Sequence, residues 1–364
     1  MAEVPQSVGE GERVWAYALL NGFSDPVILV DGERRTVFAN TAASSVMDIK
    51  TVGRDLAISF RHPSALEAVD EVLESGIEKT VDVIIAAPIQ RTFQLQTRRV
   101  EFSGPEQGGV MIVMRDVTAM KSADQMRRDF VANVSHELRS PISSLVGIIE
   151  TLRESAKADL DSQKRFLKIM AEEAARMSRL IDDLLSLSRV EVSEHMPPDK
   201  SVDISSILEV TIELLQGRAM ENGMAILLST AASLPDIPGD PDELTEVFEN
   251  LIDNAIKYGD PKSDINVSIM QIDRIPELNI PCLAICVKNK GDGIPTEHLP
   301  RLTERFYRAD KGRSRVTGGT GLGLAIVKHI VNRHRGRLSI ESLPGETTTF
   351  TVYLPLFSDG RHSN

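Results

Sequence analysis

A histidine beside a glutamate is the first feature of the chain whose residue types could do chemistry. His136 and Glu137 lie in the stretch VANVSHELRSPISSL, and Ser140 follows one helical turn later. An exposed imidazole can act as a nucleophile, and a neighbouring carboxylate can take its proton. No second histidine or cysteine stands at metal-ligand spacing, which disfavours a zinc site at His136. The simplest alternative is a solvated histidine without a role.

The apolar residues around His136 recur every three or four positions, which predicts a long amphipathic helix. The stripe consists of Val131, Val134, Leu138, Ile142, Leu145, Ile149 and Leu152. At about 100° per residue, His136 falls roughly 160° from the centre of this stripe and therefore faces outward. Pro141 lacks a backbone donor and should bend the helix just after the histidine.

A second stripe predicts a second helix, and the two together predict a hairpin. Its members are Phe166, Ile169, Met170, Met177, Leu180, Ile181, Leu184 and Leu187. Two such helices supply only half of a core. A second copy of the chain would complete a four-helix bundle, so we expect a homodimer through the helical hairpin.

The C-terminal part offers groups that could hold a nucleotide. In FENLIDNAIKYGD, the spacing of Asn250, Asn254 and Lys257 places all three on one helix face, with Tyr258 next in the chain. Amide oxygens suit a hard cation such as Mg²⁺, and a lysine suits phosphate. Asn pairs on helices are more often plain surface, so this motif needs support from its neighbours.

Two glycine-rich stretches provide that support. NKGDGIP contains Gly291 and Gly293, which allow the backbone to approach a flat ligand. GGTGLGL opens a helix, where backbone N–H groups bind anions. It is not a P-loop, because it lacks the terminal G-K-S/T, and no βαβ unit surrounds it as in a Rossmann turn. Between them, Phe306 and Tyr307 precede a basic run that could cover phosphates, with Arg308, Lys311, Arg313 and Arg315.

Composition limits the classes of protein that fit. The 364 residues allow two or three domains, and a net charge of −12 argues against a nucleic-acid binder. No uncharged apolar run approaches the ~18 to 20 residues of a membrane-spanning helix, so we expect a cytoplasmic protein with no membrane anchor in this chain. Cys282 and Cys286 would lie about 13 Å apart on a strand, too far for a disulfide, and are interpreted as core residues.

The pattern along the chain predicts an α+β multidomain protein with three domains. Residues 14–118 combine β-branched runs with short helices, as in an α/β sensor module. Residues 119–195 form the helical hairpin, and residues 202–357 form an α/β sandwich. His62, in the first domain, could be imagined as a haem ligand but is interpreted as a loop residue before a proline.

Taken in order, these motifs resemble the sensor histidine kinases of two-component systems over about residues 125–357. VSHELRSP resembles the phosphoacceptor box of the dimerisation domain. The Asn helix, NKGDGIP, the Phe306 segment and GTGLGL resemble the four boxes of the family's GHKL-type ATP-binding domain. DPVILVD and RRTVFANTAA resemble PAS sensor domains. With RRDFVANVSHELRSPISSL they resemble phosphate-regulon sensor kinases.

The resemblance implies a function and a set of site residues. ATP and Mg²⁺ would bind the C-terminal domain, with Asn254 on the metal, and His136 would take the γ-phosphoryl group with Glu137 as base. A response regulator receiver domain would then receive it, and Ser140 would serve a possible phosphatase activity. The implied nucleotide-binding residues are Asn250, Asn254, Lys257, Tyr258, Asn289, Gly291, Gly293, Ile294, Phe306, Arg308, Gly319, Thr320, Gly321, Leu322 and Gly323.

Asn289 departs from the family pattern. The family usually has an aspartate there, whose carboxylate accepts from the adenine amino group. An amide oxygen can also accept, but a neutral hydrogen bond is about half as strong. One alternative is therefore an impaired scaffold that binds a regulator without using ATP. Another is an ATPase of the gyrase or chaperone type, in which the histidine hairpin has no place.

Overall fold

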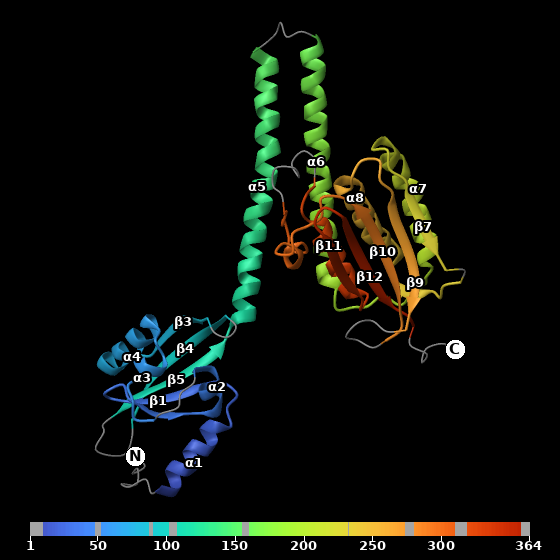
Figure 1. Ribbon diagram of the computed structural model, residues 1–364. Helices are drawn as coiled ribbons and strands as arrows, with labels where there is room; N and C mark the ends of the chain where they lie inside the picture. Colours follow the sequence, from blue (N-terminus) through green and yellow to red (C-terminus); the bar gives the residue numbers. More distant parts are fainter. Residues whose placement is uncertain are drawn as a thin grey trace. The chain divides into compact units, whose positions relative to one another are not determined.

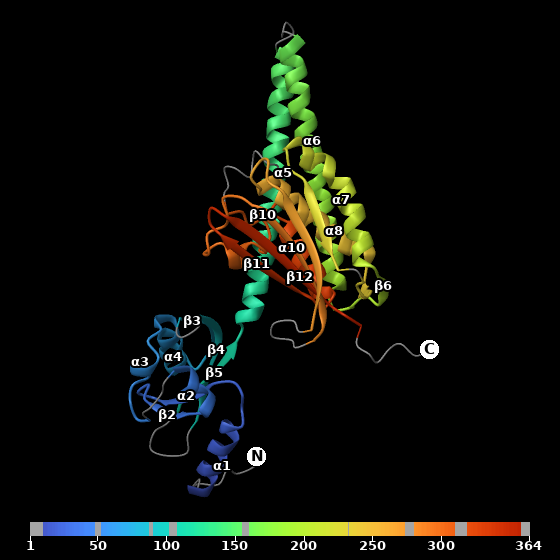
Figure 2. The ribbon, with the colours of Figure 1, turned by 45° about the vertical axis from the view of Figure 1, so that its right-hand side comes forward.

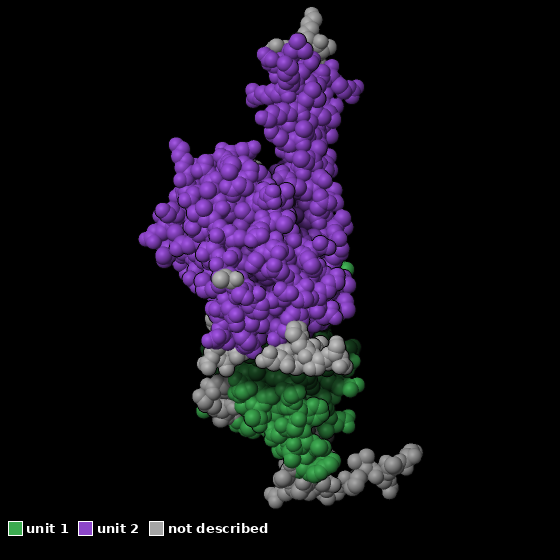
Figure 3. Space-filling view, turned by 90° about the vertical axis from the view of Figure 1, so that its right-hand side faces the viewer, with its two compact units in different colours: residues 1–129 green, residues 130–364 purple. Residues whose placement is uncertain are grey.

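The computed structural model describes residues 10–47, 52–86, 90–101, 108–154, 160–231, 233–273, 280–309 and 319–357. The chain folds into two compact units, residues 1–129 and 130–364 (Figure 3). None of the helices in the described ranges combines the length and the apolar character that crossing a bilayer requires.

The first unit contains a five-stranded antiparallel sheet with the strand order β2-β1-β5-β4-β3. The strands arise from the β-branched and alternating runs of the sequence, as predicted. Their bounds are Val27–Asp31 for β1, Thr36–Ala39 for β2, Lys79–Ile85 for β3, Arg91–Val100 for β4 and Gly109–Asp116 for β5.

Short helices accompany this sheet and contribute to its core. They are α1 (Glu10–Asn21), α2 (Thr41–Met47), α3 (Leu56–Ser59) and α4 (Pro63–Ser75). Helix α4 begins at Pro63 and ends at Ser75, and the following Gly76 has a φ of 74°, the left-handed conformation that terminates helices. His62 immediately precedes this proline, as the loop interpretation predicts. Val69 and Val72 of α4 and Phe93 of β4 are fully or almost fully buried.

Two long helices, α5 (Thr118–Glu154) and α6 (Leu160–Ser193), form the predicted hairpin and run side by side (Figure 1). Helix α5 continues through Pro141 without a break. Its apolar stripe remains open in the single chain, since Val131 is 59% exposed, Ile142 is 47% exposed and Ile149 is 42% exposed. Such a stripe requires a partner surface, as a hairpin with half a core does.

The rest of the second unit is an α/β sandwich. Its main sheet has the order β11-β12-β10-β9-β7, and only the β7–β9 pair is parallel. Helices α7, α8 and α10 pack against this sheet (Figure 2). The elements are β6 (Lys200–Val202), α7 (Ile204–Glu221), β7 (Ile226–Thr230), β8 (Ile237–Gly239), α8 (Pro241–Tyr258), β9 (Ile265–Ile272), β10 (Cys282–Lys290), η1 (Leu299–Arg301), α10 (Gly323–Arg333), β11 (Arg337–Leu343) and β12 (Thr347–Pro355).

Both cysteines lie on β10 as free thiols, as predicted. Cys282 is buried in the sheet, and burial raises the pKa of its thiol to about 11. The Cys286 sulfur lies 3.4 Å from the Thr351 hydroxyl of the neighbouring strand β12.

The mixed helix and sheet class, the long hairpin and the sandwich all agree with the sequence prediction.

Candidate functional site

A cavity of about 490 Å³ in the second unit gathers most of the predicted nucleotide-binding residues. Helix α8, the end of β10, the segment after β10 and the glycine loop before α10 form its walls. The predicted residues that line it are Asn250, Asn254, Lys257, Tyr258, Asn289, Gly293, Ile294, Arg308, Gly319, Thr320, Gly321 and Gly323.

Helix α8 presents its polar side to this cavity because its other side is core. Asp240 caps the helix by accepting from the N–H groups of Asp242 and Glu243, and Pro241 begins it. The Asn250 Nδ2 donates to the Glu246 carbonyl at 2.9 Å, which leaves its Oδ1 as an acceptor. These constraints hold the amide oxygen in one orientation. A fixed amide oxygen is a suitable ligand for Mg²⁺.

Lys257, one turn after Asp253, supplies positive charge on the same helix. Its Nζ lies 2.5 Å from the Asp253 Oδ2, and an Arg218 nitrogen lies 2.6 Å from the other carboxylate oxygen. Both cations line the cavity. Asp253 therefore holds two cationic side chains at the wall of the cavity.

Two glycines of the cavity wall, Gly323 and Gly293, are required by the close approach of other atoms. A Cβ on Gly323 would lie 2.3 Å from the Asn250 Oδ1, and one on Gly293 would lie 2.6 Å from the Leu343 carbonyl oxygen. Gly293 also has a φ of 70°, which side chains rarely adopt. At each of these glycines an oxygen atom approaches the backbone more closely than any side chain would allow.

Asn289 stands near the end of β10 and is only 5% exposed. Its Nδ2 donates to the Lys290 carbonyl at 3.0 Å, so its Oδ1 remains as the acceptor. Thr348, its partner across the β10–β12 pair, lines the cavity with it. A buried acceptor suits the exocyclic amino group of adenine, and the cavity volume and glycine walls fit an adenine nucleotide.

Three predicted residues lie outside the lining of this cavity. Gly291 packs against Tyr258, whose carbonyl oxygen would lie 2.7 Å from an added Cβ, and Leu322 is fully buried in the core. The Phe306 ring lies 5.9 Å from the Phe130 ring of α5, while its N–H donates to the Gly321 carbonyl. The predicted basic run Lys311, Arg313 and Arg315 lies outside the described residues.

The hairpin residues form a separate site. His136 and Ser140 are exposed on α5, as the helical projection predicts. Glu137 is half-buried, and a nitrogen of Arg176 on α6 donates to its Oε2 at 3.0 Å. None of these residues lines the nucleotide cavity. His136, Glu137 and Ser140 are therefore separate from the cavity.

Sequence reasoning missed the contribution of α6 to the cavity. Arg179 and Asp183, one turn apart on α6, both line it. The Thr320 hydroxyl donates to the Asp183 Oδ2 at 2.6 Å, and burial raises the pKa of the Asp183 carboxyl. No local signal predicts this contact, because Asp183 and Thr320 are 137 positions apart.

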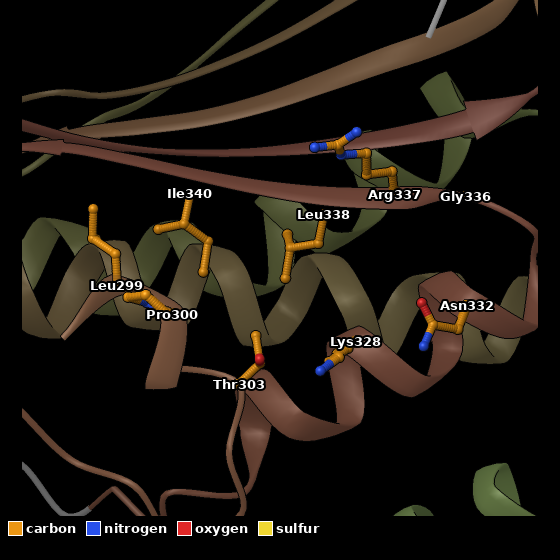
Figure 4. A pocket seen from close by; sticks show the side chains of 9 residues that line it. All are labelled: Leu299, Pro300, Thr303, Lys328, Asn332, Gly336, Arg337, Leu338 and Ile340. Atoms are coloured by element: carbon orange, nitrogen blue, oxygen red, sulfur yellow. The ribbon is translucent and has the colours of Figure 1, made fainter. Parts of the chain in front are cut away.

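A second cavity of about 400 Å³ lies among η1, α10 and β11 (Figure 4). Aliphatic side chains such as Leu299, Leu338 and Ile340 form much of its wall, with Lys328 and Asn332 from α10. It contains none of the predicted nucleotide-binding residues. The first cavity, with its glycines, amides and cations, is therefore the candidate nucleotide site.

Comparison with known families agrees with this geometry. Residues 126–192 match the family described as His Kinase A (phospho-acceptor) domain, and residues 239–358 match Histidine kinase-, DNA gyrase B-, and HSP90-like ATPase. The chain belongs to the sensor histidine kinases, and it is a protein-histidine kinase with an ATP-binding domain. The phospho-acceptor match disfavours an ATPase of the gyrase or chaperone type.

Individual relatives agree with the assignment to the sensor histidine kinases. The phosphate regulon sensor protein PhoR of Pseudomonas aeruginosa is 35% identical over 333 residues, covering 90% of this chain and 71% of that protein. The sensor histidine kinase WalK of Bacillus subtilis is 33% identical over 362 residues, covering 97% of this chain and 57% of that protein. The histidine kinase ThkA, solved in complex with the response regulator protein TrrA, shares the fold, with a TM-score of 0.51 and 17% identity over 94% of this chain and 99% of ThkA.

Proposed function

We propose that the chain phosphorylates its own His136 from ATP bound with Mg²⁺ in the 490 Å³ cavity. Bound ATP supplies the γ-phosphoryl group. An imidazole nitrogen of His136 forms the bond to phosphorus as the bond to the ADP oxygen breaks, and Glu137 takes the imidazole proton. Positioning and neutralisation of charge supply most of the acceleration in such transfers.

The residues of the cavity divide this work between them. The Oδ1 of Asn289 would accept from the base, and the amide oxygens of Asn254 and Asn250 would hold the metal beside the phosphates. Lys257 neutralises phosphate charge. The glycine loop at 319–323 lets backbone N–H groups approach the phosphates. The observation that carries the proposal is the convergence of these groups on one cavity.

A response regulator is the proposed recipient of the phosphoryl group. Phosphohistidine is reactive, so a receiver-domain aspartate docked on the hairpin can take the group from His136. The ThkA complex, in which a kinase with this fold assembles with a response regulator, supports this class of partner. The open apolar stripe of α5 supports a homodimer through the hairpin. Ser140, exposed one turn after His136, is the candidate for positioning water during dephosphorylation of the regulator.

The first unit is proposed as a PAS-like sensor. Its antiparallel sheet order and short helices support a sensor domain at about residues 14–118, followed by the hairpin to 195 and the ATP-binding domain from 202 to 357. A cytoplasmic location of the chain agrees with the free cysteines of the ATP-binding domain, since free thiols persist in reducing compartments.

Labelling with γ-³²P ATP and Mg²⁺ tests the proposal. We expect the full chain to acquire label that is lost in acid and survives alkali, as a phosphoramidate requires. His136→Ala should remove the label, while His195→Ala, which changes another exposed histidine of the same unit, should keep it. Label on His136→Ala would exclude His136 as the acceptor.

An Asn289→Asp arm separates the kinase from an impaired scaffold. The carboxylate should strengthen the bond to adenine and lower the ATP concentration that gives half-maximal labelling. Label on the wild type supports a working kinase. Label on Asn289→Asp alone would favour a scaffold whose base pocket no longer holds ATP.

A further inference from the structure

Helix α6 is held against the ATP-binding fold by polar contacts along one of its sides. The Ser186 hydroxyl donates to the Glu246 carboxylate of α8 at 2.6 Å. Farther along, a nitrogen of Arg305 lies 2.6 Å from Glu191, and Glu194 lies 2.8 Å from a ring nitrogen of His329 on α10. Leu187 and Val190 are buried along the same side. This is a built interface, and we call it the docked arrangement.

Asp183 extends this interface into the nucleotide cavity. It lies one turn before Leu187 on α6, it lines the cavity, and it accepts a hydrogen bond from the Thr320 hydroxyl of the glycine loop. Lys257 lines the same cavity and supplies a cationic amine there. A carboxylate with two oxygens therefore stands among groups whose chemistry also binds phosphate oxygens.

We propose that Asp183 occupies the phosphate end of the nucleotide cavity as an anionic stand-in, so that ATP binding and the docked arrangement exclude each other. This inference rests on the proposed function of the cavity. A triphosphate and a carboxylate compete for Thr320, for the glycine loop and for the field of Lys257. A phosphate that accepted from Thr320 would lie next to the Asp183 carboxylate, and like charges in contact repel strongly inside a protein, so one must leave when the other enters.

This competition has a mechanical consequence. His136 does not line the cavity in the docked arrangement, so phosphoryl transfer requires the ATP-binding fold to leave its place on α6 or to serve the partner subunit. Expelling Asp183 couples ATP binding to that release. The apparent affinity for ATP is then the intrinsic affinity reduced by the fraction of molecules that are undocked.

Calorimetric titration of the full chain with ATP, ADP or adenosine, each with Mg²⁺, tests the proposal. A His136→Ala background prevents turnover. We expect Asp183→Asn to bind ATP about tenfold more tightly, because a negative charge has been removed from the phosphate end. The gain should be smaller for ADP and absent for adenosine. Asp182→Asn removes the same charge from the preceding position of α6, which is exposed, and should leave all three affinities unchanged.

A variant outside the cavity separates the effect of undocking from the effect of removing charge from the cavity. Glu194→Gln weakens the contact with His329 and should tighten ATP binding by a few fold through undocking alone. Weaker binding of ATP by Asp183→Asn would show that Asp183 supports the glycine loop, and it would overturn the inference. Unchanged affinity would also overturn it, while label on His136 of the wild type would leave the proposed function intact. No nucleotide binding by any variant would overturn both.

Discussion

The two chemical regions of the second unit are built in opposite ways. In the nucleotide cavity, a Cβ added to Gly323 or Gly293 would lie 2.3 or 2.6 Å from a neighbouring oxygen atom, and Asn289 is 5% exposed. Around His136 the helix is exposed, and Glu137 keeps one partner, Arg176. At a tightly packed site, a substitution that weakens binding also destabilises the fold. At an exposed site on a helix face, a substitution can abolish the reaction without unfolding the protein.

This difference follows from what each region must do. A cavity that selects a nucleotide has to be preformed, because each loose side chain would cost ordering free energy on binding. A phosphoacceptor has to meet two other proteins or domains in turn, so it must project from the surface. The predictions below test whether packing and chemistry are truly joined in one region and separate in the other.

The largest effect is expected for Gly293→Ala. Gly293 has a φ of 70°, and an added Cβ would lie 2.6 Å from the Leu343 carbonyl oxygen. Strain and overlap together should destabilise the ATP-binding fold by about 4 kcal/mol and abolish nucleotide binding. Hydrogen exchange of α8 and β10 peptides measures the first effect, and calorimetry measures the second.

Gly345→Ala is the matched control for this change. Gly345 has a similar φ of 78°, but nothing lies within 4 Å of an added Cβ. It should cost only about 1 kcal/mol, the strain of the left-handed conformation itself. Equal costs for the two variants would mean that backbone conformation, rather than close packing, governs the cavity wall.

Glu137→Gln should slow the reaction strongly while leaving the fold almost as stable as in the wild type. We expect the rate of His136 labelling to fall about 100-fold, because a general base typically contributes that much or more. The unfolding free energy should change by less than about 1 kcal/mol, since the ion pair with Arg176 is half-exposed. Rates from rapid-quench labelling and exchange of α5 peptides provide the two readings. A loss of stability that matches the loss of rate would erase the contrast with the cavity.

The sequence predicts features that depend on local periodicity. Helical spacing alone puts Asn250, Asn254 and Lys257 on one side of α8, and the same rule turns His136 outward. Alternating β-branched residues likewise locate the strands of the first unit. Each of these statements requires only a few neighbouring residues.

Contacts between distant elements follow a different rule. The Asp183–Thr320 and Glu137–Arg176 contacts join positions 137 and 39 residues apart. They depend on how α6 packs against the ATP-binding fold and on the register of the hairpin. No pattern within either segment determines these quantities. No motif in the α6 segment marks Arg179 or Asp183, and only the folded chain shows that both line the cavity.

A pH effect of intermediate size should be confined to the packed region. His334 is 3% exposed, its Nδ1–H donates to the Ile330 carbonyl, and its Nε2 accepts from the Asp240 N–H. Burial lowers the pKa of His334 from its usual 6.5, so the folded protein keeps it neutral. The neutral, buried His334 therefore contributes to the free energy of unfolding in full above pH 6.5. This contribution is lost as the pH falls from 6.5 towards the lowered pKa, because His334 in the unfolded chain then binds a proton while the folded chain does not.

The expected slope is up to about 1.4 kcal/mol per pH unit below that point. Hydrogen exchange of α8 peptides between pH 7 and pH 5, corrected for intrinsic exchange, measures it. His334→Gln should lack this part of the slope, whatever its stability at neutral pH. An identical slope in both proteins would assign the acid sensitivity to other groups.

The smallest change in stability is expected for Arg176→Gln. The Arg176 side chain is 20% exposed and its Glu137 partner 34%, so solvent screens the pair and its loss should cost less than about 1 kcal/mol. Labelling of His136 should nevertheless slow severalfold, because Glu137 loses the contact that fixes its orientation. Arg176→Lys should restore part of the rate, since a lysine keeps the charge but not the planar geometry of the guanidinium. If Arg176→Gln instead unfolds α5 and α6, then the hairpin is as tightly coupled as the cavity, and its chemistry is not separable from its packing.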